Sequence, residues 1–176
     1  MKISISLVLI CFCLGLYGQS ENLKFEIDKT GLLIELPNNE WHLTDFQNDT
    51  VKGVTVRFFK RNEILDSDSL FIIPNIGVIT EHVGDSLDVI NYSIQKRMQT
   101  PFNVDGVLTF DSGELGYNNS VGFKGKYKDE RFEHLLYMTY AISKGYGIQI
   151  IMDCTMSVSG TVDKEFIKCL KGLKIK

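Results

Sequence analysis

Hydrophobic and polar residues alternate along much of this chain, as they do in β-strands that have one buried face. Residues 23–28 (LKFEID) and 32–37 (LLIELP) show this alternation on either side of a short turn. Pro37 ends the second run, because proline has no N–H to donate to a sheet. Further extended runs are predicted at residues 53–60, 70–83, 106–115, 120–128, 131–142 and 146–156.

The run at residues 131–142 is apolar on both of its faces. One face holds Leu135, Tyr137 and Ala141, and the other holds Phe132, Leu136, Met138, Tyr140 and Ile142. A strand with two apolar faces is buried on both sides. We therefore expect this strand at the centre of a sheet, followed by a tight hairpin at Lys144-Gly145.

Two segments change to the helical period and are predicted to be amphipathic helices. In residues 85–100 the apolar positions are Leu87, Ile90, Ile94 and Met98, and in residues 161–176 they are Phe166, Leu170 and Leu173. Pro101 follows the first segment, and the residue before a proline disfavours helical conformation. Strands with two helices predict an α+β domain, with a mostly antiparallel sheet and one helix on each face.

Trp41 is the sole tryptophan, and it stands four residues after the proline that ends the second strand. A tryptophan at this place can fold back over the end of the sheet and bury a large apolar area, while its N–H finds a partner. We interpret it as a lid on the core. The alternative is an aromatic side chain that stacks on a ligand.

The order of elements resembles that of the PsbP-like superfamily, which also includes the DcrB-like envelope proteins and a Ran-binding nuclear-transport factor. The resemblance rests on a strand pair ending in Pro37 and reaching Trp41, a helix at SLDVINYSIQKRM, an antiparallel meander and a final helix at EFIKCLKGLKIK. It covers about residues 23–176 and implies an α/β/α sandwich, with helices packed on both faces of an antiparallel sheet. Such domains act as binding or assembly modules, and the resemblance assigns no functional residue.

The first residues have the layout of a secretory signal peptide. Lys2 precedes an apolar run at residues 3–16, and the small Gly18 precedes Gln19. The run is shorter than the roughly 20 residues that span a bilayer, so we predict a cleaved signal at 1–18 and a single domain at 19–176. Cys11 and Cys13 follow bulky residues and do not fit a lipid-attachment site. The chain is thus expected to be exported, periplasmic or secreted, with no membrane span after cleavage near Gly18/Gln19.

Charge and composition exclude several classes of protein. The formal net charge of the chain is −3, and it contains no run of lysine or arginine. Nucleic-acid binding proteins present clustered basic residues, so no nucleic-acid partner is expected. We find no nucleophile-elbow, phosphate-loop or His-Glu-x-x-His pattern. We therefore expect no catalytic residue, no metal and no cofactor.

The remaining cysteines, Cys154 and Cys169, leave two alternatives open. Cys154 is in phase with the apolar face of its strand, and Cys169 borders the apolar stripe of the last helix. If they meet, a disulfide closing this loop would stabilise the fold by roughly 3 kcal/mol, and export permits it. Otherwise they are buried free thiols.

Other polar and aromatic residues support weaker hypotheses. Glu81 and His82 adjoin in one strand and point to opposite faces, so a metal site there is disfavoured. Residues 66–69 (DSDS) lack the glycine and the distant glutamate of a calcium loop. The candidate binding-face aromatics are Trp41, Tyr117, Tyr127, Tyr137 and Tyr146.

These observations together predict an exported, non-catalytic binding or assembly module of the bacterial envelope, with another envelope protein as its partner. One alternative is a small-ligand or lipid-binding carrier. Another is a hydrolase whose site is assembled from distant segments, because such sites are defined by geometry and not by spacing in the sequence.

Overall fold

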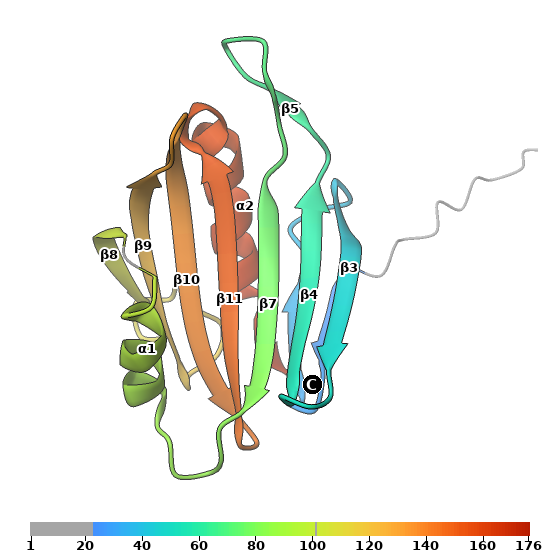
Figure 1. The fold of residues 1–176 in the computed structure, drawn as a ribbon, viewed down its shortest axis with the longest axis vertical. Coiled ribbons are helices and arrows are strands. Elements are labelled where there is room, and N and C mark those ends of the chain that lie inside the picture. Colours follow the sequence, from blue (N-terminus) through green and yellow to red (C-terminus); the bar gives the residue numbers. More distant parts are fainter. Residues whose placement is uncertain (1–22, 101) are drawn as a thin grey trace, which may run out of the picture.

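The computed structural model describes residues 23–100 and 102–176, and the predicted signal peptide therefore lies outside the described residues. An antiparallel sheet of seven strands dominates the fold (Figure 1). Its strands, from one edge to the other, are β3 (Trp41–Asp49), β4 (Val54–Arg61), β7 (Asn75–His82), β11 (Tyr146–Thr155), β10 (Glu133–Ser143), β9 (Ser120–Lys128) and β8 (Asn103–Thr109).

β10 lies inside this sheet, as its two apolar faces predicted. It pairs with β9 on one side and with β11 on the other. The hairpin to β11 turns at Lys144 and Gly145, which both have positive φ, at 51° and 74°. Two successive residues with positive φ form the tight turn that matches the twist of paired strands.

Two smaller sheets complete the strand structure. β1 (Lys24–Ile27), β2 (Leu32–Glu35) and β12 (Lys174–Ile175) form one of them, in the order β1-β2-β12. β5 (Ile64–Leu65) and β6 (Phe71–Ile72) form a hairpin near one end of the large sheet (Figure 1). The predicted strand at 70–83 is therefore divided into β6 and β7, and Pro74 lies at the break.

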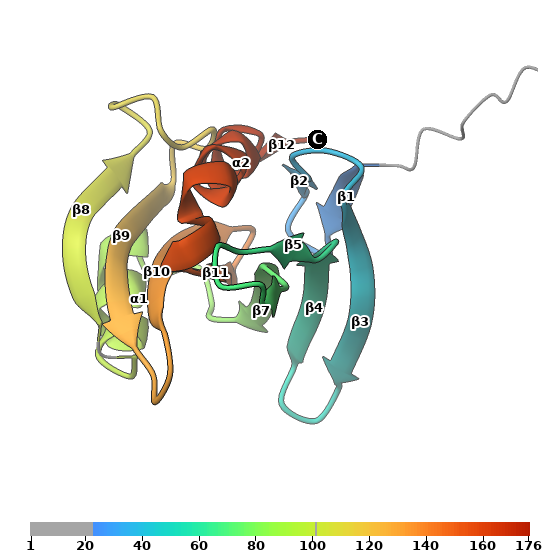
Figure 2. The ribbon, with the colours of Figure 1, turned by 90° about the horizontal axis from the view of Figure 1, so that it is seen from above.

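The C-terminal helix α2 (Ser159–Lys171) follows a short 3-10 turn, η1 (Met156–Val158), and covers one face of the large sheet (Figure 2). The predicted stripe of Phe166, Leu170 and Leu173 is completely buried. It packs in one core cluster with β1, β2 and the inward face of the central strands. Burial of such side chains contributes about 1.5–3 kcal/mol each. Most of the buried apolar residues belong to this cluster, so this layer holds most of the core.

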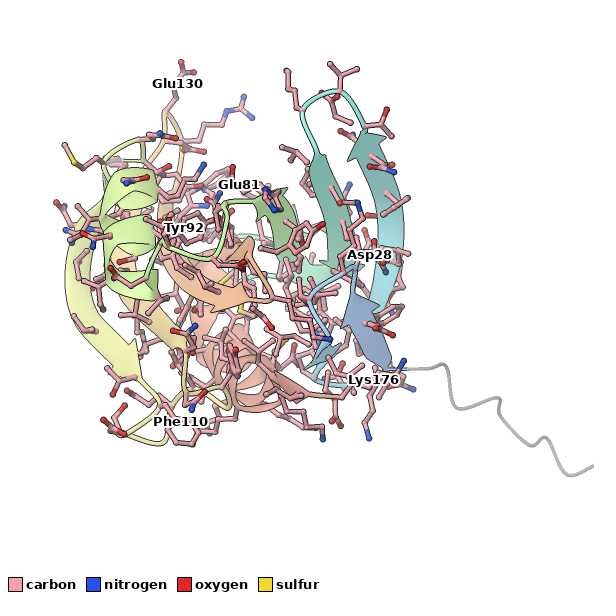
Figure 3. All side chains as sticks on the ribbon, turned by 90° about the horizontal axis from the view of Figure 1, so that it is seen from below. Asp28, Glu81, Tyr92, Phe110, Glu130 and Lys176 are labelled. Atoms are coloured by element: carbon pink, nitrogen blue, oxygen red, sulfur yellow. The ribbon has the colours of Figure 1, made fainter. Side chains whose placement is uncertain are left out.

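The first helix, α1 (Val89–Arg97), lies on the other face and packs on β9 and β10 (Figure 3). The side chains that it buries are Tyr92 and Ser93, in contrast to the stripe predicted from spacing. Ile90, Ile94 and Met98 are instead 53%, 52% and 81% exposed. The helix was predicted correctly, but the face that packs on the sheet was not.

The predicted α/β/α sandwich, with helices packed on both faces, is wrong. The described residues form twelve strands and two α-helices, so the fold is dominated by sheets. α1 has nine residues, packs mainly on β9 and β10 and reaches β7 and β11 through Tyr92, away from β3 and β4 (Figure 3). A short helix at one side of a seven-stranded sheet cannot form a complete third layer.

Candidate functional site

A groove between α1 and the edge of the large sheet is the candidate site, and we name it the α1 groove. Its volume is about 690 Å³. This lies within the range of about 300–1,000 Å³ that is typical of small-ligand sites. The lining residues are Ile94, Arg97, Met98, Thr100, Phe102, Asn103, Phe123, Lys126, Tyr127 and Lys128.

Contacts of Glu81 hold α1 in place beside the groove. The completely buried Tyr92 donates its hydroxyl hydrogen to Glu81 Oε1 at 2.7 Å, and Lys96 Nζ lies 2.6 Å from the same oxygen. Burial, and then the hydrogen bond to Glu81, raise the pKa of Tyr92 above its ordinary value. Gly147 provides the space, because a Cβ there would lie 2.5 Å from the Tyr92 ring. Tyr92 therefore faces the sheet, and the opposite side of α1 faces solvent.

The wall opposite α1 is formed by aromatic side chains from β9 and from the segment that leads into β8. Phe123 packs edge-on against Tyr140 at 6.1 Å between ring centroids. Tyr127 stacks on His134 at 4.6 Å, with 18° between the planes. These rings are fixed by their neighbours, so the apolar wall is formed before any ligand binds.

The charged groups of the groove are all cationic. Arg97 lies over the Phe123 ring, 4.9 Å from its centroid. Lys126 and Lys128 come from β9 and alternate there with Phe123 and Tyr127, so their side chains point to the opposite face of the sheet, where Lys126 also borders a second pocket beside Asp163. The lining contains no acidic residue. Among the described residues these three side chains form no ion pair. The groove therefore combines an apolar surface with one cation, Arg97, that has no ion-pair partner among the described residues.

His134 supports the Tyr127 wall between two carboxylates. Its Nδ1 lies 3.1 Å from Asp153 Oδ1, and its Nε2 lies 3.1 Å from Asp129 Oδ2. Asp129 also accepts hydrogen bonds from the backbone N–H groups of Phe132 and Arg131, and these hold its pKa below the ordinary value. Both ring nitrogens of His134 are thus engaged, and neither is free to activate a serine hydroxyl.

A second surface is formed by the β5–β6 hairpin, and we name it the hairpin surface. Leu65 and Phe71 pair across the hairpin and are 57% and 66% exposed, and Leu70 and Ile73 beside them are also exposed. Asp66 Oδ1 accepts the backbone N–H groups of Asp68 and Leu70, both at 2.9 Å. That carboxylate stabilises the turn.

The five candidate aromatics do not gather on one face. Trp41 and Tyr137 belong to the α2-side core, where Trp41 packs on Phe166 at 5.9 Å between centroids. Tyr117 donates to the carbonyl oxygen of Ile142 at 3.0 Å, and Tyr146 lies edge-on to His82. Of the five, Tyr127 alone lines the α1 groove.

The other residues singled out from the sequence are buried in the core or held by contacts within the fold. Cys154 and Cys169 are both free and lie in the same core cluster, where burial raises the pKa of each thiol to about 12. Glu81 contacts Tyr92 and Lys96, and within residues 23–100 and 102–176 no group of three His, Cys, Asp or Glu is placed to hold a metal ion. None of the helices in this same part of the chain is long and apolar enough to cross a membrane.

Sequence reasoning missed most of the groove. Arg97, Phe102 and Phe123 carry no motif, and they become neighbours only when α1 packs on β9. The run Lys126-Tyr127-Lys128 was no signal for the groove either, because neighbouring residues of a strand point to opposite faces, and the two lysines lie on the face opposite to Tyr127. The hairpin surface was missed because the strands predicted at residues 53–60 and 70–83 left residues 61–69, and with them β5, outside any predicted element.

Comparison with known proteins shows a shared fold. The solved structure of LpqN, which is involved in cell envelope biogenesis of Mycobacterium tuberculosis, superposes with a TM-score of 0.51. The match covers 85% of this chain and 86% of LpqN at 12% sequence identity. No protein-family model matches the chain, so the PsbP-like resemblance stays a prediction. No curated protein matches the sequence either. What the chain shares with LpqN is its fold.

Proposed function

We propose that this chain is an exported, non-catalytic binding module of the bacterial cell envelope that docks onto a protein partner through the hairpin surface. The predicted signal peptide supports export. The fold shared with LpqN, a protein involved in cell envelope biogenesis, supports the envelope as its place of action. His134, with both nitrogens beside carboxylates, supports a role without catalysis.

The observation that carries the proposal is the exposure of the apolar side chains of the hairpin surface. Leu65, Leu70, Phe71 and Ile73 lie within a few residues of one another around one projecting turn. Grouped apolar side chains on a protein surface mark interaction sites, whereas scattered ones do not. The acidic Glu63 and Asp68 beside them favour a partner whose apolar pocket has a basic rim.

The test is native mass spectrometry of the mature protein, purified gently from the envelope of its own host. We expect a complex with one defined partner in the wild type, and its loss in the double variant Leu65→Ser/Phe71→Ser. Both side chains are exposed, so the variant should keep the wild-type melting temperature. Val51→Ser is the matched control, because Val51 is 95% exposed on a different turn. A monomer without partner in the wild type would refute the proposal.

A carrier of a small ligand or lipid is the second candidate function, and the α1 groove favours it. The groove has the volume of a ligand site and aromatic walls that are fixed by neighbouring side chains. A small molecule that remains bound in the same mass spectra would support this function. Its presence or absence is independent of the hairpin variant.

A further inference from the structure

We propose that the α1 groove binds a single-chain anionic amphiphile, that is, an acyl or alkyl chain ending in a carboxylate or phosphate. This inference rests on the ligand-carrier candidate and not on the hairpin surface. It follows from the division of the groove into an apolar part and a cationic part. The groove binds the amphiphile as a single dissolved molecule, and the protein does not bind to the surface of a bilayer.

The apolar part of the groove matches a hydrocarbon chain. Ile94 and Met98 project from α1 with more than half of each side chain exposed. Phe102 and Phe123 lie opposite them and are only half-buried. A chain lying between these side chains would remove apolar surface from water on both sides. Each buried methylene group contributes about 0.8 kcal/mol, so a chain of a dozen carbons could supply most of the affinity.

The cationic part matches a single anionic head group. Arg97 is held by its contact with Phe123, so its guanidinium lies where the apolar wall meets solvent. Lys126 and Lys128 flank Tyr127 on β9 and point to the opposite face of the sheet, so Arg97 is the cation of this part. Guanidinium groups bind carboxylate and phosphate through two parallel hydrogen bonds, so Arg97 alone can hold such a head group. With no acid in the lining, an anion at this place meets attraction alone.

The surrounding charges favour a monomer over a membrane surface. Lys96, the other cation of α1 near the groove, is already paired with Glu81. Asp88 caps α1 at one end, and Asp129 and Glu130 follow Lys128 directly at the turn after β9. Figure 3 shows Glu130 on the same side of the molecule as α1. A flat anionic bilayer would meet these carboxylates, whereas a single amphiphile in the groove would not.

Isothermal titration calorimetry of the mature protein tests the inference with dodecyl phosphate below its micelle concentration. We expect one site per chain and weaker binding as salt increases. A dodecyl ether with an uncharged ethylene glycol head group should bind at least about tenfold more weakly, because it loses a charge-assisted contact. Inorganic phosphate alone should bind weaker still, since it lacks the chain.

Variants assign the two parts of the groove separately. Arg97→Gln should weaken dodecyl phosphate by about tenfold and leave the uncharged ether unchanged. The double variant Lys126→Gln/Lys128→Gln, on the opposite face of the sheet, should change the affinity for neither ligand. Met98→Ser should weaken both ligands. Lys52→Gln is the matched control, because Lys52 is an exposed lysine on the β3–β4 turn, away from the groove. Arg97, Met98, Lys128 and Lys52 are exposed and Lys126 is partly exposed, so the variants should keep the wild-type melting temperature.

Four results would overturn the inference. They are equal affinity for the charged and the uncharged ligand, no effect of Arg97→Gln, binding to phosphatidylglycerol vesicles without binding of the monomer, and tighter binding of an acidic peptide than of dodecyl phosphate. If no amphiphile binds but a partner protein still depends on Leu65 and Phe71, the inference fails and the proposed function stands.

Discussion

Glu165 should be among the most important polar side chains for the stability of this fold. It lies on α2, and its contacts join this helix to the segment between β2 and β3 and to β4. Trp41 Nε1 donates to Oε2 at 2.8 Å, and Asn38 Nδ2 donates to Oε1 at 2.9 Å. Arg61 donates through Nε at 3.0 Å and through Nη2 at 3.3 Å. The side chains of Arg61 and Glu165 are only 13% and 15% exposed.

Replacing Glu165 by alanine would leave the indole N–H and the guanidinium without their acceptor. Breaking one side of a buried ion pair costs about 3–5 kcal/mol, and the remaining exposure here places the expected loss near the lower limit. We expect Glu165→Ala to lower the free energy of unfolding by about 3 kcal/mol and the Tm by roughly 6–12 °C. Glu165→Gln keeps one acceptor oxygen, so it should lose roughly half as much.

The same contacts give the prediction a pH dependence. Burial raises the pKa of Glu165, but hydrogen bonds from Arg61, Trp41 and Asn38 outweigh it and hold the pKa below the ordinary value. A depressed pKa in the folded state stabilises the fold above the ordinary glutamate pKa of about 4.3. This contribution is lost as the pH falls through the folded-state pKa. The difference between wild type and Glu165→Gln should therefore shrink in acid.

Urea unfolding followed by circular dichroism at pH 7 and at pH 3 measures both effects. Glu130→Ala is the control, because Glu130 is an exposed glutamate on the turn between β9 and β10. Two outcomes would refute the reasoning. One is a Glu165→Ala variant within about 0.5 kcal/mol of wild type, which is the range of ordinary surface substitutions. The other is a Glu165→Gln variant that loses as much stability at pH 3 as at pH 7.

Three further predictions concern close packing and the buried thiols. Gly147→Ala should push Tyr92 away from the sheet and cost about 1–3 kcal/mol, with faster amide hydrogen exchange in α1; unchanged exchange would contradict the role given to Gly147. Gly125→Ala should destabilise more, because its Cβ would lie 2.0 Å from the backbone oxygen of Asn103; nuclear magnetic resonance shifts confined to the β8–β9 pair and the α1 groove would confirm the cause. Cys154 and Cys169 should react with Ellman's reagent at pH 8 only after unfolding, since burial raises the pKa of both thiols to about 12; rapid labelling of the native protein would show that the core opens there.

Several features follow from sequence pattern alone, because they depend on neighbours along the chain. Period-two alternation located most strands of the sheet, and the two apolar faces of residues 131–142 identified β10 as a central strand. Helical spacing in α2 predicted the buried Phe166, Leu170 and Leu173. Trp41 was interpreted as a lid on the core, and it is buried against Phe166 with its N–H bonded to Glu165.

The tertiary structure decided what depends on distant partners. β3 was not predicted, because an edge strand pairs on one side only and most of its side chains stay exposed and polar. In α1, the stripe of isoleucine and methionine faces solvent, because Tyr92 occupies the side of the helix that faces the sheet. The Tyr92 ring is buried there, and its hydroxyl donates to Glu81 of β7, eleven residues earlier in the chain. The α1 groove exists for the same reason. Its cations and rings come from α1, β9 and the start of β8, and only the packing of these elements makes them one site.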